Sequence, residues 1–269
     1  MTVDVLQLTD THLRGTAAPL LPPVEFSDAV ALLTGRSADE LAASVVTAAL
    51  ERRAGRLFDV ALHTGDIADP VSDSGYDDAR ALLRSAGHTV LATPGNHDSP
   101  EGFVRVLGGS AQPLTVHHDV GAWRVVLISS AQPPHSAGHY QTEALEAVAS
   151  AVDVDRPVAL ATHHPPVSPC SDPECCTANA WSLLDIIDRH SNVKMVLSGH
   201  LHVADEITRR GVNYYVSPST ALQLRHVHPL PDNNHAATDV GARVLRLHDD
   251  GTHDTHIEWL GDGPSSDAG

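Results

Sequence analysis

Aspartate, asparagine and histidine side chains recur in five short motifs that could bind metal ions. The motifs are Asp10-Thr11-His12, Gly65-Asp66, Gly95-Asn96-His97-Asp98, His163-His164-Pro165 and Gly199-His200-Leu201-His202. In the first and last motifs the potential ligands stand two residues apart, a spacing that points both side chains to one side of an extended segment. Mixed imidazole, carboxylate and amide ligands favour Mn, Fe or Zn over Ca. The motifs therefore predict transition-metal chemistry, provided that they meet in space.

Each motif directly follows a predicted β-strand. Apolar, strand-like runs occupy 3–8, 60–62, 90–92, 125–128, 158–161 and 193–197. Helical patterns separate most of these runs, and such an alternation predicts βαβ units. Ligands of open α/β sheets bind at the carboxyl ends of the strands, so motifs that are distant in sequence can converge there.

The clearest helix signal is a capping box formed by Ser37 and Glu40, followed by an apolar stripe that starts at Leu41 and stops before Gly55. Further helices are predicted at 77–86, 142–151 and 178–190. After His202 the pattern changes, because no helix separates the next strands. These short strands are predicted at 206–209, 212–216, 221–224, 242–247 and 255–259. An antiparallel second sheet fits this part of the chain best.

Composition favours one domain. The chain has 269 residues, of which 42% are hydrophobic, enough for a substantial core. We expect a single domain over 1–260 and a disordered tail over 261–269. No apolar run approaches the roughly 18 residues of a membrane span, and the chain starts with a strand instead of a leader. The cysteines Cys170, Cys175 and Cys176 crowd into one loop without a zinc-binding spacing, which suits a reducing compartment, so we expect a soluble cytoplasmic protein.

The formal net charge is −17. An acidic surface repels nucleic-acid backbones, which are bound by clustered Lys and Arg, and the chain has only 17 such residues. We therefore expect no nucleic acid as a partner. A small phosphorylated substrate remains compatible, because bound cations reverse the local field. A homodimer is the assembly that we consider.

Taken in order, the five motifs resemble the signature of the calcineurin-like metallophosphoesterases. The segments 162–166 and 217–220, with Gln223, are similar to the class III bacterial cyclic-nucleotide phosphodiesterases. The resemblance covers most of the chain except the tail. It implies an α/β fold: a four-layer α-β-β-α sandwich of two mixed β-sheets, face to face, with flanking helices outside.

The resemblance also implies a pair of metal ions, Mn, Fe or Zn. Two such ions need an anionic ligand between them, and Asp66 is the expected bridge. Asp10, His12 and His202 would complete one site. Asn96, His163 and His200 would complete the other. A hydroxide that bridges the ions is expected to attack phosphorus in line.

His97 is the candidate general acid that protonates the departing oxygen. Asp98 either orients the His97 imidazole or caps a loop, and the sequence does not separate these interpretations. Asn96, His97 and His139 are the candidate substrate contacts, although surface exposure is the favoured explanation for His139. His164 either supports the neighbouring ligand or is a turn residue. The segment 20–23 could form a lid or a plain surface loop.

These expectations combine into one function: hydrolysis of a 3',5'-cyclic nucleotide, cyclic AMP before others, to the nucleoside 5'-monophosphate. Two alternatives keep the same metal-binding residues. The first is hydrolysis of another small phosphodiester, such as a glycerophosphodiester or a phospholipid precursor. The second is a non-catalytic, metal-dependent binding protein.

Overall fold

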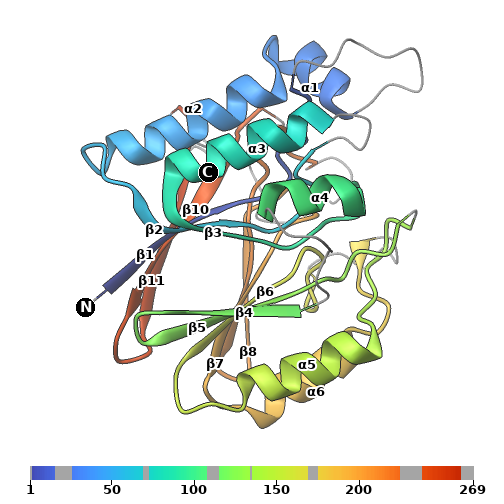
Figure 1. The fold of residues 1–269 in the computed structure, drawn as a ribbon, viewed down its shortest axis with the longest axis vertical. Helices are drawn as coiled ribbons and strands as arrows, with labels where there is room; N and C mark the ends of the chain where they lie inside the picture. The colour runs from blue at the N-terminus through green and yellow to red at the C-terminus, as the bar shows by residue number, and fades with distance from the viewer. Residues whose placement is uncertain are drawn as a thin grey trace, which may run out of the picture.

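In the computed structural model, two β-sheets pack face to face and helices cover their outer faces (Figure 1). The structure describes residues 2–15, 26–68, 73–107, 115–133, 135–168, 175–224 and 238–261. The sheets have five and six strands, and both are mixed. The predicted four-layer α-β-β-α sandwich is therefore confirmed.

The first sheet has the strand order β11-β10-β1-β2-β3. Its strands are β1 (Thr2–Leu8), β2 (Phe58–His63), β3 (Gly87–Ala92), β10 (Gly241–His248) and β11 (His253–Trp259). β1, β2 and β3 run parallel, so their carboxyl ends share one edge. β10 returns antiparallel to β1 and places Arg243 opposite Gln7.

The second sheet has the order β4-β5-β6-β7-β9-β8. Its strands are β4 (Thr115–Val120), β5 (Trp123–Ile128), β6 (Val158–Ala161), β7 (Val193–Ser198), β8 (Asp205–Arg209) and β9 (Val212–Val216). The four inner strands are parallel, and the two edge strands are antiparallel to their neighbours. The inner strands therefore also end at a common edge.

Helices bury the outer face of each sheet (Figure 1). Those on the first sheet are α1 (Phe26–Thr34), α2 (Ala38–Glu51), α3 (Asp73–Ala86) and α4 (Pro100–Leu107). Those on the second are α5 (Thr142–Val152) and α6 (Ala180–Arg189). The capping box of α2 is confirmed, because the Glu40 amide donates to Ser37 Oγ (3.1 Å) and the Ser37 amide donates to Glu40 Oε2 (3.0 Å). Apolar clusters fill the three spaces between the layers.

Two predictions about the last third of the chain are wrong. Its strands form no separate sheet: β8 and β9 extend the second sheet, and β10 and β11 extend the first. The segment 221–224 is not a strand. Ser219 Oγ accepts the amides of Ala221 (2.9 Å) and Leu222 (3.2 Å), so a side chain takes backbone donors that a strand ladder would need.

The sequence patterns also missed three elements, α1, α4 and β4. β4 is an edge strand whose residues His117, His118 and Asp119 are exposed, so it lacks the apolar alternation that marks a half-buried strand. The helix predicted at 77–86 begins earlier in the structure, at Asp73. Cys175 is buried and Cys176 is partly exposed.

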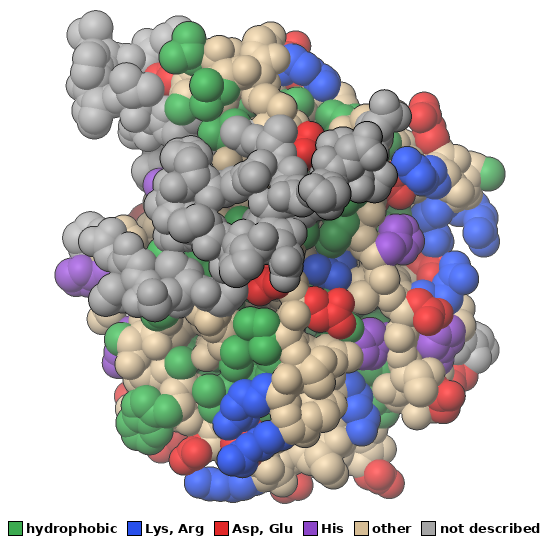
Figure 2. Space-filling model, turned by 180° about the vertical axis from the view of Figure 1, so that it is seen from behind, with side chains coloured by type: hydrophobic (Ala, Val, Ile, Leu, Met, Phe, Trp, Pro, Cys, Tyr) green, Lys and Arg blue, Asp and Glu red, His purple; other side chains and the backbone are tan. Residues whose placement is uncertain are grey.

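Several predictions fall outside the described residues, namely those on segment 20–23, on Cys170 and on the tail from 262 onward. In the described part of the chain, no helix is both long and apolar enough to cross a membrane. On the face shown in Figure 2, Lys and Arg side chains lie among Asp and Glu side chains. The single domain, the cytoplasmic location, the homodimer and the lack of a nucleic-acid partner stay predictions.

Candidate metal centre

The five motifs meet where the carboxyl ends of the two sheets face each other. Asp10 and His12 follow β1, Asp66 follows β2 and Asn96 follows β3. His163 follows β6 in the second sheet, and His200 and His202 follow β7. Backbone hydrogen bonds join the loops directly, since the Asp10 amide donates to the Gly65 carbonyl (2.9 Å) and the Gly199 amide donates to the His163 carbonyl (3.0 Å).

Asp10, His12 and His202 form a first group of possible metal ligands. One ligand atom from each lies within 4.8 Å of the others, and all three side chains are buried. His202 Nε2 is 3.2 Å from Asp10 Oδ1. Ligand atoms that share an ion about 2.1 Å away lie roughly 3.0 to 3.4 Å apart, so this pair has the spacing of a shared ion.

Asp66 lies between this group and a second one. Asp66 Oδ2 is 3.3 Å from His163 Nε2 and 3.9 Å from His12 Nε2. Asn96 Oδ1 lies 3.2 Å from His163 Nε2, and the His200 ring lies 5.1 Å from the His163 ring, centroid to centroid. The structure thus gathers all seven expected ligands and places one oxygen of Asp66 between histidines assigned to different ions.

Backbone carbonyls fix the orientation of two of these histidines. His163 Nδ1 lies 2.7 Å from the Thr64 carbonyl, and His202 Nδ1 lies 2.6 Å from the Leu222 carbonyl. A carbonyl can only accept, so each Nδ1 carries the proton and each Nε2 is directed at a carboxylate. Metal-binding histidines use this arrangement, in which the outer hydrogen bond fixes the tautomer.

The charges of the cluster favour a cation. Burial opposes charge on His163, but Asp66 and Asp10 outweigh it and raise its pKa to about 9. Burial likewise opposes charge on His202, whose pKa Asp10 raises. Burial also works against ionised Asp10 and Asp66, yet the imidazoles hold the pKa of both carboxyls well below the usual range. Two buried carboxylates thus stay ionised at a point where positive charge is stabilised.

Backbone strain is concentrated in the same residues. Seven non-glycine residues of the described part have a positive φ, and five of them are expected ligands. These five are Asp10 (51°), His12 (45°), Asp66 (54°), His200 (69°) and His202 (51°). Such conformations are costly for residues with a Cβ and persist where the surroundings impose them, often at functional sites.

Two motif positions require glycine, because residues of another loop lie too close to leave room for a Cβ atom. A Cβ at Gly199 would overlap the Thr9 hydroxyl, and a Cβ at Gly95 would overlap the Asp66 carboxylate. The Thr9 hydroxyl is itself occupied, because it donates to Asp10 Oδ2 (2.6 Å). Both glycines therefore let loops from different strands touch at the cluster.

The contacts of Asp98 favour the loop-cap interpretation. Its Oδ2 accepts the Gly95 amide (2.8 Å), and its Oδ1 accepts the Ile67 amide (3.0 Å) and the Tyr76 hydroxyl (3.2 Å). Burial, and then the charge of Asp66, raise the pKa of Asp98 to about 7. The carboxyl group thus holds the loop that carries Asn96.

His97 lies on the accessible side of the cluster. It is partly exposed, and its ring packs edge-on against that of His12 at 5.0 Å between centroids. Its amide donates to Asp66 Oδ1 (2.9 Å). Asn96 and His200 are also partly exposed, whereas Asp10 and Asp66 are buried, so a substrate would meet the first three side chains.

His164 is close to the second group but has both ring nitrogens engaged. Nε2 lies 2.7 Å from the Ser136 carbonyl and therefore donates to it, while Nδ1 lies 2.8 Å from Ser130 Oγ. Burial lowers the pKa of His164 well below the usual value. It therefore acts as a neutral support beside His163. His139 is partly exposed and follows Gly138, which packs against the His164 ring, so it borders the cluster.

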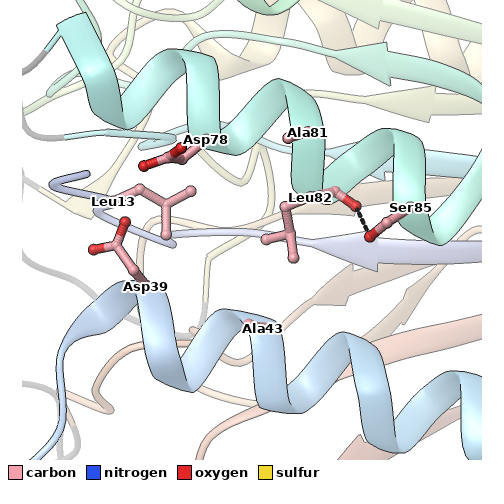
Figure 3. Close-up of a pocket in the computed structure, with 7 residues that line it drawn as sticks. All are labelled: Leu13, Asp39, Ala43, Asp78, Ala81, Leu82 and Ser85. Carbon is pink, nitrogen blue, oxygen red and sulfur yellow. Dashed lines mark hydrogen bonds between the residues drawn. The ribbon is translucent and has the colours of Figure 1, made fainter. Parts of the chain in front are cut away.

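A separate groove of about 360 Å³ lies between α2 and α3 (Figure 3). It is lined by Leu13, Asp39, Ala43, Asp78, Ala81, Leu82 and Ser85. The Asp39 carboxylate is occupied by the amides of Arg14 (3.1 Å) and Gly15 (2.9 Å), and Ser85 Oγ donates to the Leu82 carbonyl (2.7 Å). Two of its three polar side chains, Asp39 and Ser85, thus serve the local structure, and we place the functional site at the histidine cluster, where the possible metal ligands gather.

A sandwich of two mixed sheets, with Asp and His loops gathered at one shared edge, defines the metallophosphoesterase class. The chain belongs to the calcineurin-like phosphoesterase family, whose family model matches residues 3–204. Members of this family use divalent metal ions. Two fully buried groups, Asp10 with His12 and His202 and Asp10 with Asp66 and His163, have ligand atoms close enough together to hold such an ion.

Relatives agree with this assignment, and a solved structure has the same fold. The chain is 28% identical to a 3',5'-cyclic-nucleotide phosphodiesterase of Nostoc, over 95% of this chain and 92% of the relative. It is 30% identical to the 3',5'-cyclic adenosine monophosphate phosphodiesterase CpdA of Pseudomonas aeruginosa, over 96% of this chain and 90% of the relative. A dimetal phosphatase from Danio rerio shares the fold with a TM-score of 0.63 at 16% identity, over 95% of this chain and 99% of that chain.

Metal removal should destabilise the protein. A ligand bound only by the native state stabilises it by about 2.7 kcal/mol at 100 times Kd, and a loss of this size should lower Tm by roughly 5 to 10 °C. Thermal unfolding before and after chelation measures the change, and re-added Mn²⁺ should restore Tm. The same melting curve after verified metal removal would contradict metal binding by the folded chain.

Proposed function

We propose that this chain hydrolyses 3',5'-cyclic nucleotides, cyclic AMP in particular, to nucleoside 5'-monophosphates with the help of two metal ions. The observation that carries the proposal is the position of Asp66 Oδ2 between His163 and His12. Support comes from relatives that match nearly the whole chain and are named cyclic-nucleotide phosphodiesterases.

Seven side chains would hold the ions. Asp10, His12 and His202 belong to one, Asn96, His163 and His200 to the other, and Asp66 to both. When bound, such ions neutralise charge on the phosphoryl oxygens and activate water. Mn, Fe or Zn are proposed from the mixture of imidazole, carboxylate and amide ligands.

The protein's own contribution beyond binding the ions would be a proton. The ribose 3'-oxygen is a poor leaving group and benefits from protonation as it departs. His97 is suited to this role because its ring is partly exposed beside His12 while its amide is held by Asp66. His97 Nδ1 or Nε2 would donate the proton, and Asn96 would contact the phosphate.

A substrate panel tests this proposal. Metal-stripped protein is reconstituted with Mn²⁺, Fe²⁺ or Zn²⁺ and assayed with cyclic AMP, cyclic GMP, bis(nitrophenyl) phosphate and a glycerophosphodiester. We expect metal-dependent release of 5'-AMP. Turnover of the glycerophosphodiester alone would favour the other small phosphodiesters, and no turnover with any metal would favour a metal-dependent binding protein.

A further inference from the structure

The two sheets supply different parts of the cluster. The first sheet carries Asp10, His12, Asp66 and Asn96, and the second carries His163, His200 and His202. The distance between the sheets at this edge therefore sets the distance between the two sets of ligands. Most of the space between the sheets is filled by apolar side chains. Apolar contacts are non-directional, so directional bonds are needed to fix the spacing.

Gln7 makes such directional bonds. It lies one residue before the end of β1 and is fully buried. Its Nε2 donates to the Ser198 carbonyl (3.2 Å) and to Thr64 Oγ1 (3.0 Å), and its Oε1 accepts from Ser217 Oγ (2.8 Å). The Ser198 carbonyl can only accept, which fixes the orientation of the amide. Both amide hydrogens and one of the two oxygen lone pairs are used.

Each partner of Gln7 leads into a ligand loop. Ser198 is the last residue of β7 and precedes Gly199 and His200. Thr64 precedes Gly65 and Asp66, and its carbonyl holds His163 Nδ1. One side chain thus joins β1 and β2 of the first sheet to β7 of the second.

The third partner, Ser217, is held in place by Arg243. Ser217 begins the loop whose Leu222 carbonyl holds His202. Ser217 Oγ also accepts from Arg243 Nε (3.1 Å), and the buried guanidinium of Arg243 stacks over the Tyr215 ring at 4.5 Å. Thr93 Oγ1 makes another cross-sheet bond, to the Ile128 carbonyl (3.1 Å), but Ile128 ends β5, which carries no expected ligand.

We propose that Gln7 is a positioning residue that sets the spacing between the two halves of the metal centre. It touches none of the expected ligands and acts through the loops that carry them. The inference rests on the proposed two-metal function. Its consequence is that loss of the Gln7 amide should alter the coupling between the ions before it prevents folding.

The test uses protein loaded with two equivalents of Mn²⁺. Ions that share a ligand give an exchange-coupled electron paramagnetic resonance spectrum, which differs from that of isolated ions. Gln7→Met keeps the length of the side chain and removes all three bonds. We expect it to weaken or abolish the coupling and to lower affinity for the second ion by up to roughly 10-fold, the low end of the range for groups that contact a ligand directly. Ser217→Ala removes one of the three Gln7 bonds, together with the bond from Arg243 Nε to the same hydroxyl, and should shift the spectrum less, in the same direction.

Trp123→Phe is the matched control. Trp123 Nε1 donates to the His248 carbonyl (2.7 Å) and so also joins the two sheets, but at the edge opposite the cluster, where Thr2 pairs with His248. This variant should lower Tm and keep the wild-type coupling.

Wild-type coupling in both Gln7→Met and Ser217→Ala would overturn the inference. So would equal loss of coupling in Trp123→Phe, which would reveal general destabilisation. If Gln7→Met fails to fold, Ser217→Ala and Trp123→Phe decide the question. If the wild type itself never binds two coupled ions, the proposed function fails instead.

Discussion

Replacing His97 by alanine should slow cyclic AMP hydrolysis by roughly 10² to 10⁴, the usual contribution of general acid catalysis. The same variant should lose far less activity on bis(nitrophenyl) phosphate, because nitrophenolate departs without a proton. His97 is not among the seven expected ligands, so the metal content should stay near normal. The measurement is kcat/KM for both substrates, together with metal analysis.

Comparing two substrates separates the loss of a proton donor from damage to the fold or to metal loading. A disturbed fold or poor metal loading would lower both rates together, whereas a missing proton donor lowers one. His118→Ala is a matched control, since His118 is exposed on the edge strand β4. It should retain both rates. Equal losses on the two substrates in His97→Ala, or loss of metal, would remove His97 from the role of general acid.

Asp66→Asn should lower both the activity and the metal content of the protein. Oδ2 of Asp66 lies between His163 and His12, so the change removes a negative charge shared by both sites. Loss of outer ligand supports typically costs 10 to 100-fold in affinity or activity, and we expect a loss above roughly 100-fold on both substrates. Metal content should fall at both sites, whereas His202→Ala should mainly empty one.

Asp188→Asn is a suitable control for this experiment. Asp188 forms ion pairs with Arg209 and Arg210 on the surface. The same chemical change is therefore made at a carboxylate outside the metal cluster. It should retain two equivalents of metal and wild-type activity. Two tightly held equivalents in Asp66→Asn would contradict the bridging role.

Sequence patterns predicted much of the fold because apolar periodicity reports local burial. The strand at 158–161 coincides with β6, and α2 begins at its predicted capping box. Pairing between distant strands leaves no comparable local signal. The C-terminal strands were therefore grouped into one sheet, although β10 pairs with β1 and β9 pairs with β7.

The expected ligands were predictable because their side chains carry the chemistry. The groups that hold these side chains in place could not be predicted. The carbonyls of Thr64 and Leu222 orient histidines without any side-chain signal, and the role of Asp98 depends on amides 30 residues away in sequence. In the sequence, Gln7 cannot be told from an ordinary strand residue. Only its hydrogen bond to the facing sheet explains why an amide is buried at this position.

The path of the chain between the sheets also determines when the centre can form. The second sheet is built from one continuous stretch, Thr115 through Val216, so all its pairings are available once that stretch exists. The first sheet is complete only when Gly241–His248 pairs with Thr2–Leu8, which lies far earlier in the chain. Pairing two strands across so long a loop costs conformational entropy before any contact forms, and such pairing is slow. The strands that carry the ligands of the first sheet, β1, β2 and β3, pair with one another, so β10 completes a sheet edge beside ligand loops whose own strands are already paired.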